Sequence, residues 1–404
     1  MKTYAILSGL LAFFLAACGG GTPPPPSSIT LTVEDPMGSF NAAAYQVGSG
    51  SWQSLNMSGT VTKTGTFSLG SQSKYGVAVR CGGLKVKVIQ ATSVELSNPK
   101  VTCSQTTPSP VSFSVTVAVA PALFSPGDWV CLNGASCQPA ATSVTLSPTL
   151  QSGPQDLVLT LRDSSFTSVK AAKVVRNVNV TNGGNTSASL TLSDQLPPVS
   201  FTLPTSPSGY APPSVAILYR ATGGSFADVS IPPSAYRPVS GYASGDLYYA
   251  EVNASTGSTG FLTHSQLFTS TPSLSLPAPW PTGSLSVSQQ AHPIVSGLSR
   301  TDSDLRGYQM YLQIPAQIYY TATVSKGWLS GPSYTLPDLS ATGLLGYTPP
   351  SGSGSFSVSA LLSNTPLLSL DPSNPGLLSA GDYAQEATAQ ITNYTVGGGT
   401  VTLP

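Results

Sequence analysis

Past residue 28, the chain consists largely of short runs in which apolar residues alternate with serine or threonine. Residues 29–33 (ITLTV) and 111–120 (VSFSVTVAVA) show the pattern most plainly. Successive side chains of a strand point to opposite faces, so a period of two predicts strands with one buried and one solvated face. Helical periodicity is confined to short stretches such as 382–389. The alternation therefore predicts an all-β fold.

The spacing of these runs predicts how the strands are arranged. They recur about every 8–15 residues between Gly, Pro and Ser, which is typical of tandem antiparallel β-sandwich modules. The clearest hairpin joins 74–81 to 84–89, where Gly82-Gly83 accepts the positive φ of a two-residue turn. A third strand, near 94–96 or 100–103, would bring Cys103 within reach of Cys81. Further strands are expected at 156–162, 172–180, 186–192, 214–219, 247–252, 307–314, 318–324, 355–361, 387–396 and 400–403.

Loops rich in proline and serine divide the chain into modules. The breaks fall at 104–110, 195–213 and 270–283. We therefore expect modules of ordinary domain size, with the boundaries 29–104, 105–195, 196–275 and 276–404.

Two modest sequence similarities accompany this division. Residues 156–159 (DLVL) and the basic strand 173–176, which precedes an Asn-Gly turn, resemble prealbumin-like, carboxypeptidase-regulatory sandwiches. The other modules resemble immunoglobulin or fibronectin type III domains. Residues 45–52 and 219–226 also align, sharing a Tyr, a Gly, a Ser and a terminal aromatic. This alignment suggests an old duplication, although chance similarity in a biased composition is the alternative.

The N-terminal residues have the layout of a bacterial export signal. Lys2 is followed by an apolar run at 4–15, which is shorter than the roughly 20 residues needed to span a bilayer. Residues 15–18 (LAAC) resemble the lipobox of bacterial lipoproteins. The resemblance implies that 1–17 is a signal peptide and that Cys18 is acylated and becomes the mature N-terminus. An ordinary signal peptide with an incidental cysteine is the alternative.

The residues around the expected signal-peptide cleavage site predict which membrane holds the lipid anchor. Gly19 stands where an Asp would retain a lipoprotein at the inner membrane of a two-membraned bacterium, so the resemblance implies an outer-membrane or surface location. Residues 18–28 begin flexibly and continue as a stiff proline-rich tether. No later stretch reaches 18 apolar residues. We therefore expect the membrane to be a partner through acylated Cys18.

Cysteine spacing agrees with export, because disulfides form in oxidising compartments. Beyond Cys18 the chain has four cysteines, and order along the chain favours the pairs Cys81–Cys103 and Cys131–Cys137. A zinc site is the alternative, but it prefers C-x₂₋₄-C spacing, whereas the separations here are 22 and 6.

Charge is scarce throughout the chain. There are 16 Lys plus Arg against 16 Asp plus Glu, and charged residues make up 8%, against about 25% in ordinary proteins. Zero net charge argues against nucleic-acid binding, which needs a basic surface. A hydrophobic fraction of 40% argues against a disordered chain. Ser and Thr, about a quarter of all residues, are expected to surface the sheets.

The residues that could support catalysis form no recognisable motif. The sequence contains no Gly-x-Ser-x-Gly, His-Glu-x-x-His, Walker or dinucleotide-binding pattern. His264 is expected in a strand with its ring half exposed, and His292, before Pro293, in a loop. We therefore predict no catalytic residue, no cofactor and no metal.

Paired carboxylates are the remaining catalytic candidates, since a glycosidase needs two at about 5–9.5 Å. The candidates are Glu34 with Asp35, Asp302 with Asp304, and the isolated Glu251 and Glu386. Neighbouring acids in turns are typical of solvated loops. Residues 301–304 (TDSD) offer oxygen ligands for calcium but lack the Gly and distal Glu of a complete loop.

Aromatic residues could form a stacking platform for sugars. The candidates are Trp52, Trp129, Trp280, Trp328 and the pairs Tyr248-Tyr249 and Tyr319-Tyr320. Adjacent tyrosines in a strand face opposite sides, so one of each pair is expected in the core. Trp280 and Trp328, in loops, are expected to be the most exposed tryptophans, although plugging a sandwich end is favoured over ligand binding.

Together these features predict a lipid-anchored, extracytoplasmic protein of the bacterial cell envelope. We expect a structural, adhesive or binding role, with an envelope polymer or protein as partner, and no enzymatic activity. One alternative is a glycan- or polymer-binding surface lipoprotein that uses exposed aromatics. The other is an envelope hydrolase, which would require two acids, or a His and a Ser, to meet in a pocket.

Overall fold

A computed structural model describes residues 26–105, 109–342, 344–366 and 379–403. These residues form thirty β-strands and two three-residue 3-10 helices, Leu192–Asp194 and Ser340–Thr342. No helix in these ranges is long and apolar enough to cross a membrane. The all-β prediction is confirmed.

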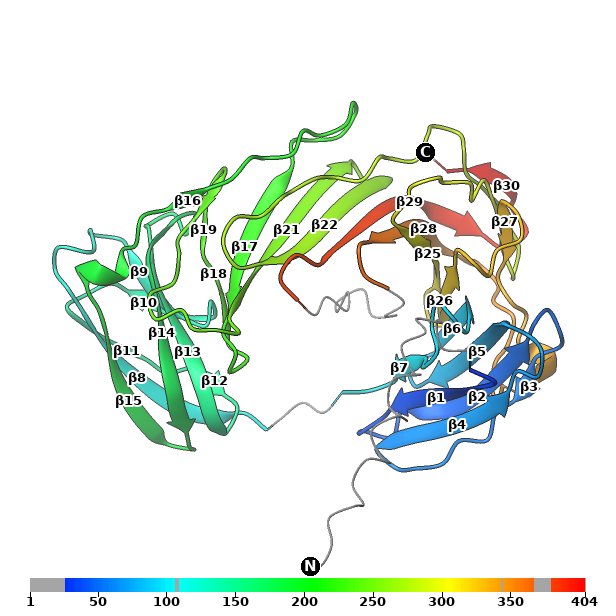
Figure 1. Ribbon diagram of the computed structural model, residues 1–404, viewed down its shortest axis with the longest axis horizontal. Helices are drawn as coiled ribbons and strands as arrows, with labels where there is room; N and C mark the ends of the chain where they lie inside the picture. Colours follow the sequence, from blue (N-terminus) through cyan, green and yellow to red (C-terminus); the bar gives the residue numbers. More distant parts are fainter. Residues whose placement is uncertain (1–25, 106–108, 343, 367–378, 404) are drawn as a thin grey trace, which may run out of the picture.

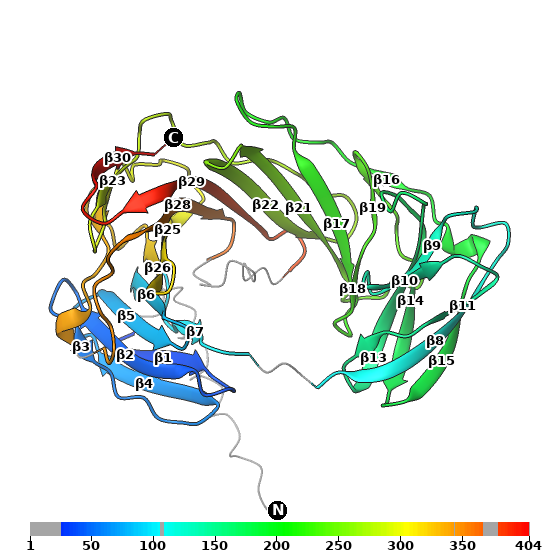
Figure 2. The same cartoon turned by 180° about the vertical axis from the view of Figure 1, so that it is seen from behind.

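A twelve-stranded sheet runs through most of the molecule and curves into an arch (Figure 1). The same arch is seen from behind in Figure 2. In spatial order its strands are β18 (Phe226–Asp228), β17 (Ser214–Arg220), β21 (Leu247–Thr256), β22 (Gly260–Phe268), β29 (Tyr383–Thr395), β28 (Ser353–Ser363), β25 (Leu305–Ile314), β26 (Ile318–Ser325), β6 (Lys85–Thr92), β5 (Lys74–Cys81), β2 (Phe40–Val47) and β3 (Gln53–Ser54).

Smaller sheets cover this sheet on opposite faces. The first contains β1 (Ser28–Glu34), β4 (Thr62–Ser68) and β7 (Lys100–Thr102), and the second contains β23 (Ser286–Gln289), β24 (Ile294–Ser296), β27 (Ser333–Thr335) and β30 (Gly399–Thr402). In β5, Val77 and Val79 belong to the core beneath the first sheet, whereas Ala78 belongs to the core beneath the second. Alternate residues of one strand therefore serve two cores.

Residues 109–195 fold into a separate sandwich of two sheets. One contains β8 (Val111–Val119), β11 (Ser143–Leu146), β12 (Thr149–Leu150) and β15 (Gly184–Leu190), and the other contains β9 (Trp129–Leu132), β10 (Ser136–Pro139), β13 (Gly153–Arg162) and β14 (Val169–Val180). Apolar residues of both sheets, such as Val117 and Leu159, are buried between them. The remaining strands β16 (Val199–Ser200), β19 (Ser230–Ile231) and β20 (Ala235–Tyr236) form a small third sheet.

Most predicted strands are present, and two local predictions are wrong. Residues 382–389 do not form a helix, because β29 pairs along its length with β22 and β28, and this tertiary pairing overrides local helix propensity. The β5–β6 hairpin has a three-residue loop rather than a two-residue turn, since Cys81 pairs with Lys85. Leu84 in that loop adopts a positive φ of 65°.

Both disulfides join the cysteines that chain order favoured. The S–S distance is 1.98 Å for Cys81–Cys103 and 2.07 Å for Cys131–Cys137. Of the two positions expected for a third strand, the structure uses the later one, β7. That strand pairs in parallel with β1, and Cys103 follows it directly.

The division into four modules stays a prediction. Strands from different predicted modules pair with one another in the structure. β6 from the first predicted module pairs in parallel with β26 from the last, and β22 from the third pairs with β29. A single sheet therefore runs through residues of three predicted modules. The two segments of the proposed repeat form hairpins, β2–β3 and β17–β18, at opposite ends of this sheet.

Candidate functional site

The junction between the 109–195 sandwich and β17 of the large sheet is crossed by two ion pairs, Arg162–Asp228 and Arg176–Asp246. Its foundation is apolar: Val158 and Val174 from the sandwich share a core with Ile217 and Tyr219. β13 and β14 therefore bury one face inside their own sandwich and the other against the neighbouring strands. A rigid platform of this kind can hold side chains in fixed positions.

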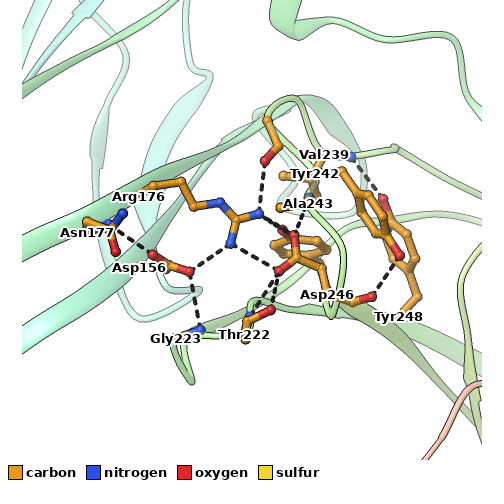
Figure 3. A network of polar contacts seen from close by, with 12 residues as sticks. Asp156, Arg176, Asn177, Thr222, Gly223, Val239, Tyr242, Ala243, Asp246 and Tyr248 are labelled. Carbon is orange, nitrogen blue, oxygen red and sulfur yellow. Dashed lines mark hydrogen bonds and ion pairs between the residues drawn. The ribbon is translucent and has the colours of Figure 1, made fainter. Parts of the chain in front are cut away.

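Arg176 lies at the centre of a polar network above this core (Figure 3). Its Nη1 is 2.7 Å from Asp156 Oδ2 and 3.0 Å from Asp246 Oδ1. Its Nη2 donates to Tyr219 Oη (3.1 Å) and to the carbonyl of Gly241 (2.9 Å), and it also pairs with Asp246. Arg176 thus connects strand β14 to three segments of the neighbouring unit.

Asp246 is the most buried member of the network, with a relative exposure of 0%. Burial alone would raise its pKa, but hydrogen bonds from Arg176, from Tyr219 and from the backbone of Ala243 and Thr222 hold the pKa well below its usual range. Hydrogen bonding to Asp246 in turn raises the pKa of Arg176, although burial opposes this. Both groups are therefore held in their charged forms.

Asp156 is positioned by an irregularity in the β13–β14 pair. The register shifts between Gln155 and Leu157, and Asn177 opposite adopts a positive φ of 53°. This places the Asp156 carboxylate where it accepts hydrogen bonds from the backbone N–H of Asn177 (3.0 Å) and of Gly223 (3.2 Å). A Cβ on Gly223 would lie 2.8 Å from Asp156, so only glycine allows this approach. The bulge directs a carboxylate across the junction.

A second ion pair reinforces the same junction. Arg162 Nη2 lies 2.9 Å from Asp228 Oδ2, and the guanidinium also donates to the carbonyls of Asp228 and Phe166. Arg237 donates to the carbonyls of Val169 (3.1 Å) and Leu196 (2.5 Å). These arginines bind fixed protein acceptors, so their arrangement fits a structural joint.

A groove of about 840 Å³ opens beside this joint. One wall belongs to the β9–β10 hairpin and the 147–155 segment, and the other belongs to the 223–226 turn. Its lining residues are uncharged, and they are Leu132, Asn133, Ala135, Ser136, Ser147, Pro148, Thr149, Leu150, Gln151, Ser152, Pro154, Gln155, Gly223, Gly224, Ser225 and Phe226.

The two histidines lie in different environments. The prediction of a half-exposed His264 ring is wrong, because the ring is buried and lies 3.0 Å from the side-chain nitrogen of Gln385 on the paired strand. Burial lowers the pKa of His264 to about 4. His292 is partly buried in a loop, 2.7 Å from Tyr347 Oη and 3.4 Å from Asp338.

The neighbouring acids singled out in the sequence have partners within the protein. Asp35 is buried and accepts hydrogen bonds from the backbone of Ser39 and Phe40, while Glu34 pairs with Lys100. Asp302 pairs with Arg300 (2.8 Å). Asp304 accepts a hydrogen bond from Tyr383 Oη (2.9 Å). In the described ranges, no group of three or more potential ligands from His, Cys, Asp and Glu could hold a metal ion.

Glu251 and Glu386 lie on one face of the large sheet, separated by strand β22. Because neighbouring strands are about 4.8 Å apart, the backbones of the strands β21 and β29, which carry these two residues, are about 10 Å apart. Asn253 donates a hydrogen bond to Glu251 (2.9 Å), and burial raises the pKa of Glu386.

The aromatic candidates divide between core and surface. Trp280, expected among the exposed tryptophans, is instead buried and donates to the carbonyl of Ala387 (2.8 Å) because it packs under the sheet. Trp52, Trp129 and Trp328 are partly buried.

The tyrosine pairs follow the prediction that one member of each is in the core. Tyr248 and Tyr320 are buried, whereas Tyr249 and Tyr319 are partly exposed on the opposite face of the sheet. Tyr311 lies on that same face, since its neighbours Met310 and Leu312 belong to the core.

No protein-family model matches the chain, and no curated protein matches it either. The predicted signal peptide 1–17, Cys18, Gly19 and most of the 18–28 tether lie outside the described residues. The charged joint and the groove were not foreseen from the sequence. The rarity of charge was the available signal, because Asp156 and Arg176 are charged residues within predicted strands of a chain in which only 8% of residues are charged.

Proposed function

We propose that this chain is a lipid-anchored, extracytoplasmic protein of the bacterial cell envelope with a structural or adhesive role. The observation that carries the proposal is the sequence at 15–18 (LAAC), which resembles a lipobox, followed by the proline-rich tether. Acyl chains on Cys18 would anchor the protein, since each buried CH₂ contributes about 0.8 kcal/mol. Gly19 favours the outer membrane or the cell surface.

The architecture beyond the tether supports this role. A structural or adhesive protein has to keep its surfaces in a fixed arrangement at a distance from the membrane. The continuous sheet and the joint at Arg176 hold the described residues beyond 109 together through backbone pairing, a shared core and the Arg176–Asp246 ion pair. Two disulfides suit an oxidising compartment outside the cytoplasm.

Replacing Cys18 tests the anchor. We expect Cys18→Ala to abolish both acyl labelling with palmitate and recovery in the membrane fraction, because no other cysteine stands at the lipobox position. Gly19→Asp is the matched control: it should keep the acyl label and move the protein to the inner membrane in a two-membraned host. Unchanged membrane recovery of Cys18→Ala would refute the lipoprotein proposal.

Binding of a neutral polymer is the second candidate function. The observation that favours it is the polar face of the large sheet, where Tyr311 and Tyr319 lie outside the core among Ser, Thr and Gln side chains. Tyr249 lies partly exposed on the same face, beside Leu267. Tyrosine rings offer flat surfaces on which sugar rings stack. A variant with all three tyrosines changed to alanine tests this sheet face separately from the groove that Gln151 and Phe226 line.

A further inference from the structure

We propose that the groove between the 132–136 hairpin and the 223–226 turn is a binding site for a short neutral saccharide. The site is independent of the membrane anchor and is separate from the tyrosine-bearing sheet face. Its volume of about 840 Å³ lies within the range of small-ligand sites, about 300–1,000 Å³.

The lining selects the chemical class of ligand. No residue that lines the groove carries a charge, so an anionic or cationic ligand would lose hydration without gaining an ion pair. The hydroxyls of Ser136, Ser147 and Thr149 and the amide of Gln151 make no side-chain hydrogen bond to another described residue. They supply both donors and acceptors, which is what a ligand with many hydroxyl groups requires.

Phe226 provides the most exposed large apolar side chain of the groove. It is one of the most exposed large hydrophobic residues in the described ranges, at 57%. It lies in the edge strand β18, so no further strand of the sheet covers it. A solvent-exposed ring beside free hydroxyl and amide groups matches a sugar, whose ring has an apolar C–H face and a polar rim.

Both walls are fixed before a ligand arrives. The Cys131–Cys137 disulfide closes the β9–β10 hairpin, and Asn133 Oδ1 accepts the N–H of Val158 (2.8 Å). The opposite turn is held because Gly223 donates to Asp156, the same carboxylate that pairs with Arg176 (Figure 3). Preorganised walls lower the entropic cost of binding. The charged joint therefore positions the groove without contacting the ligand.

An extended peptide is the less favoured occupant. Peptides that bind at a sheet edge rely on main-chain hydrogen bonds along several residues. The strands at this groove are short, with three residues in β18 and two in β12. A peptide would gain few such bonds here, whereas a saccharide uses the side-chain groups that are present.

Titration of the full-length acylated protein in lipid nanodiscs tests the site. The probes are neutral tetrasaccharides: an α-glucan, a β-glucan and an N-acetylglucosamine oligomer, measured by calorimetry. We expect one of them to bind, Phe226→Ala to weaken its affinity at least 10-fold, and Gln151→Ala about 3-fold or more. Leu192→Ala, with a similarly exposed side chain (56%) outside the groove, should change affinity less than twofold.

Four outcomes would overturn the proposal. None of the tetrasaccharides binds, Phe226→Ala leaves the affinity unchanged, the triple tyrosine variant alone abolishes binding, or a Ser/Pro-rich peptide displaces the saccharide and itself binds more tightly. Cys18→Ala in detergent-free buffer must bind the saccharide with the affinity of the wild-type protein, because the groove does not depend on the anchor. Unchanged membrane recovery of Cys18→Ala with intact saccharide binding would therefore refute the lipoprotein proposal alone.

Discussion

The molecule is held together by two joints that use different chemistry. At the first joint, residues 29–104 meet the C-terminal residues through the parallel β6–β26 pair, in which Lys85 to Gln90 align with Tyr319 to Val324. At the second joint, the 109–195 sandwich meets β17 and β21 by packing sheet faces around Arg176. The first joint is made mainly by backbone pairing, and the second is made mainly by side-chain packing and ion pairs.

Side chains at the first joint add to a connection that the backbone already makes. Glu95 accepts a hydrogen bond from the Gly327 N–H (2.7 Å), Lys74 donates to the carbonyl of Trp328 (2.6 Å), and Tyr334 donates to Gln90 (2.7 Å). None of these contacts joins two charged groups. Their loss would leave the β6–β26 ladder in place.

The second joint concentrates the scarce charge of the chain. Two ion pairs, Arg162–Asp228 and Arg176–Asp246, cross this joint, three more lie within the adjoining sandwich, and Asp246 is fully buried. A buried carboxylate that loses its cation keeps its desolvation cost without compensation. We therefore expect the joint that depends on ion pairs to be the one more easily broken by a single substitution.

Replacing Arg176 should produce the largest effect. We expect Arg176→Met to lower the free energy of unfolding by about 3–5 kcal/mol, because it leaves Asp246 and Asp156 without their cation. Urea denaturation measures this loss. Hydrogen exchange should place it at the amides of Thr222 and Ala243, which donate to Asp246.

A surface ion pair provides the control for this substitution. Lys100→Met removes the partner of Glu34, but these side chains are 57% and 40% exposed. Exposed pairs contribute about 0–1 kcal/mol. If the two substitutions cost the same, the charged joint does not have the role argued for it.

The strands could be predicted from the sequence because their signal is local. Alternation identified the segments now seen as β1, β8 and β25, since each of these strands buries alternate residues in a core. The strands β5 and β13 were also predicted, although both of their faces are buried. The Cys81–Cys103 pair could be favoured because both cysteines lie in one short stretch of chain.

The joints and the groove could not be predicted, because they depend on long-range pairing. β6 and β26 are separated by more than two hundred residues, and nothing in either strand specifies its parallel partner. Asp156, Arg176 and Asp246 likewise come from three segments that only the folded chain brings together. Residue types alone therefore predicted that the acidic side chains are solvated. In the folded chain, several of them are instead buried and accept hydrogen bonds.

Mild acid should weaken the β22–β29 pairing while leaving the Arg176 joint intact. His264 has a pKa of about 4 in the folded protein, against 6.5 as its ordinary value. Between these values the unfolded chain binds a proton that the folded chain does not, so stability falls as the pH decreases from 6.5 to 4. We expect a loss of about 2 kcal/mol between pH 7 and pH 5, calculated from that shift.

The Arg176 joint responds in a lower pH window. The pKa of Asp246 and that of Asp156 are lowered, so their contribution persists above the unfolded value of about 3.9 and is lost only as the pH falls further. His264→Gln should therefore flatten the pH 7 to 5 decline measured by urea denaturation. Protection of the Thr222 amide should not change over this range. A decline that persists in His264→Gln would assign it to other groups.

The smallest effect is expected at the backbone joint. Glu95→Gln removes a charged acceptor from Ser325 Oγ and the Gly327 N–H but keeps the shape of the side chain. We expect a loss of about 1 kcal/mol, because a charged hydrogen bond is replaced by a neutral one and the β6–β26 ladder persists. Hydrogen exchange at Gly327 should increase while the amides of β6 stay protected. A loss as large as that of Arg176→Met, with exchange spreading along β6, would show that this joint also depends on a single side chain, and the contrast between the two joints would no longer hold.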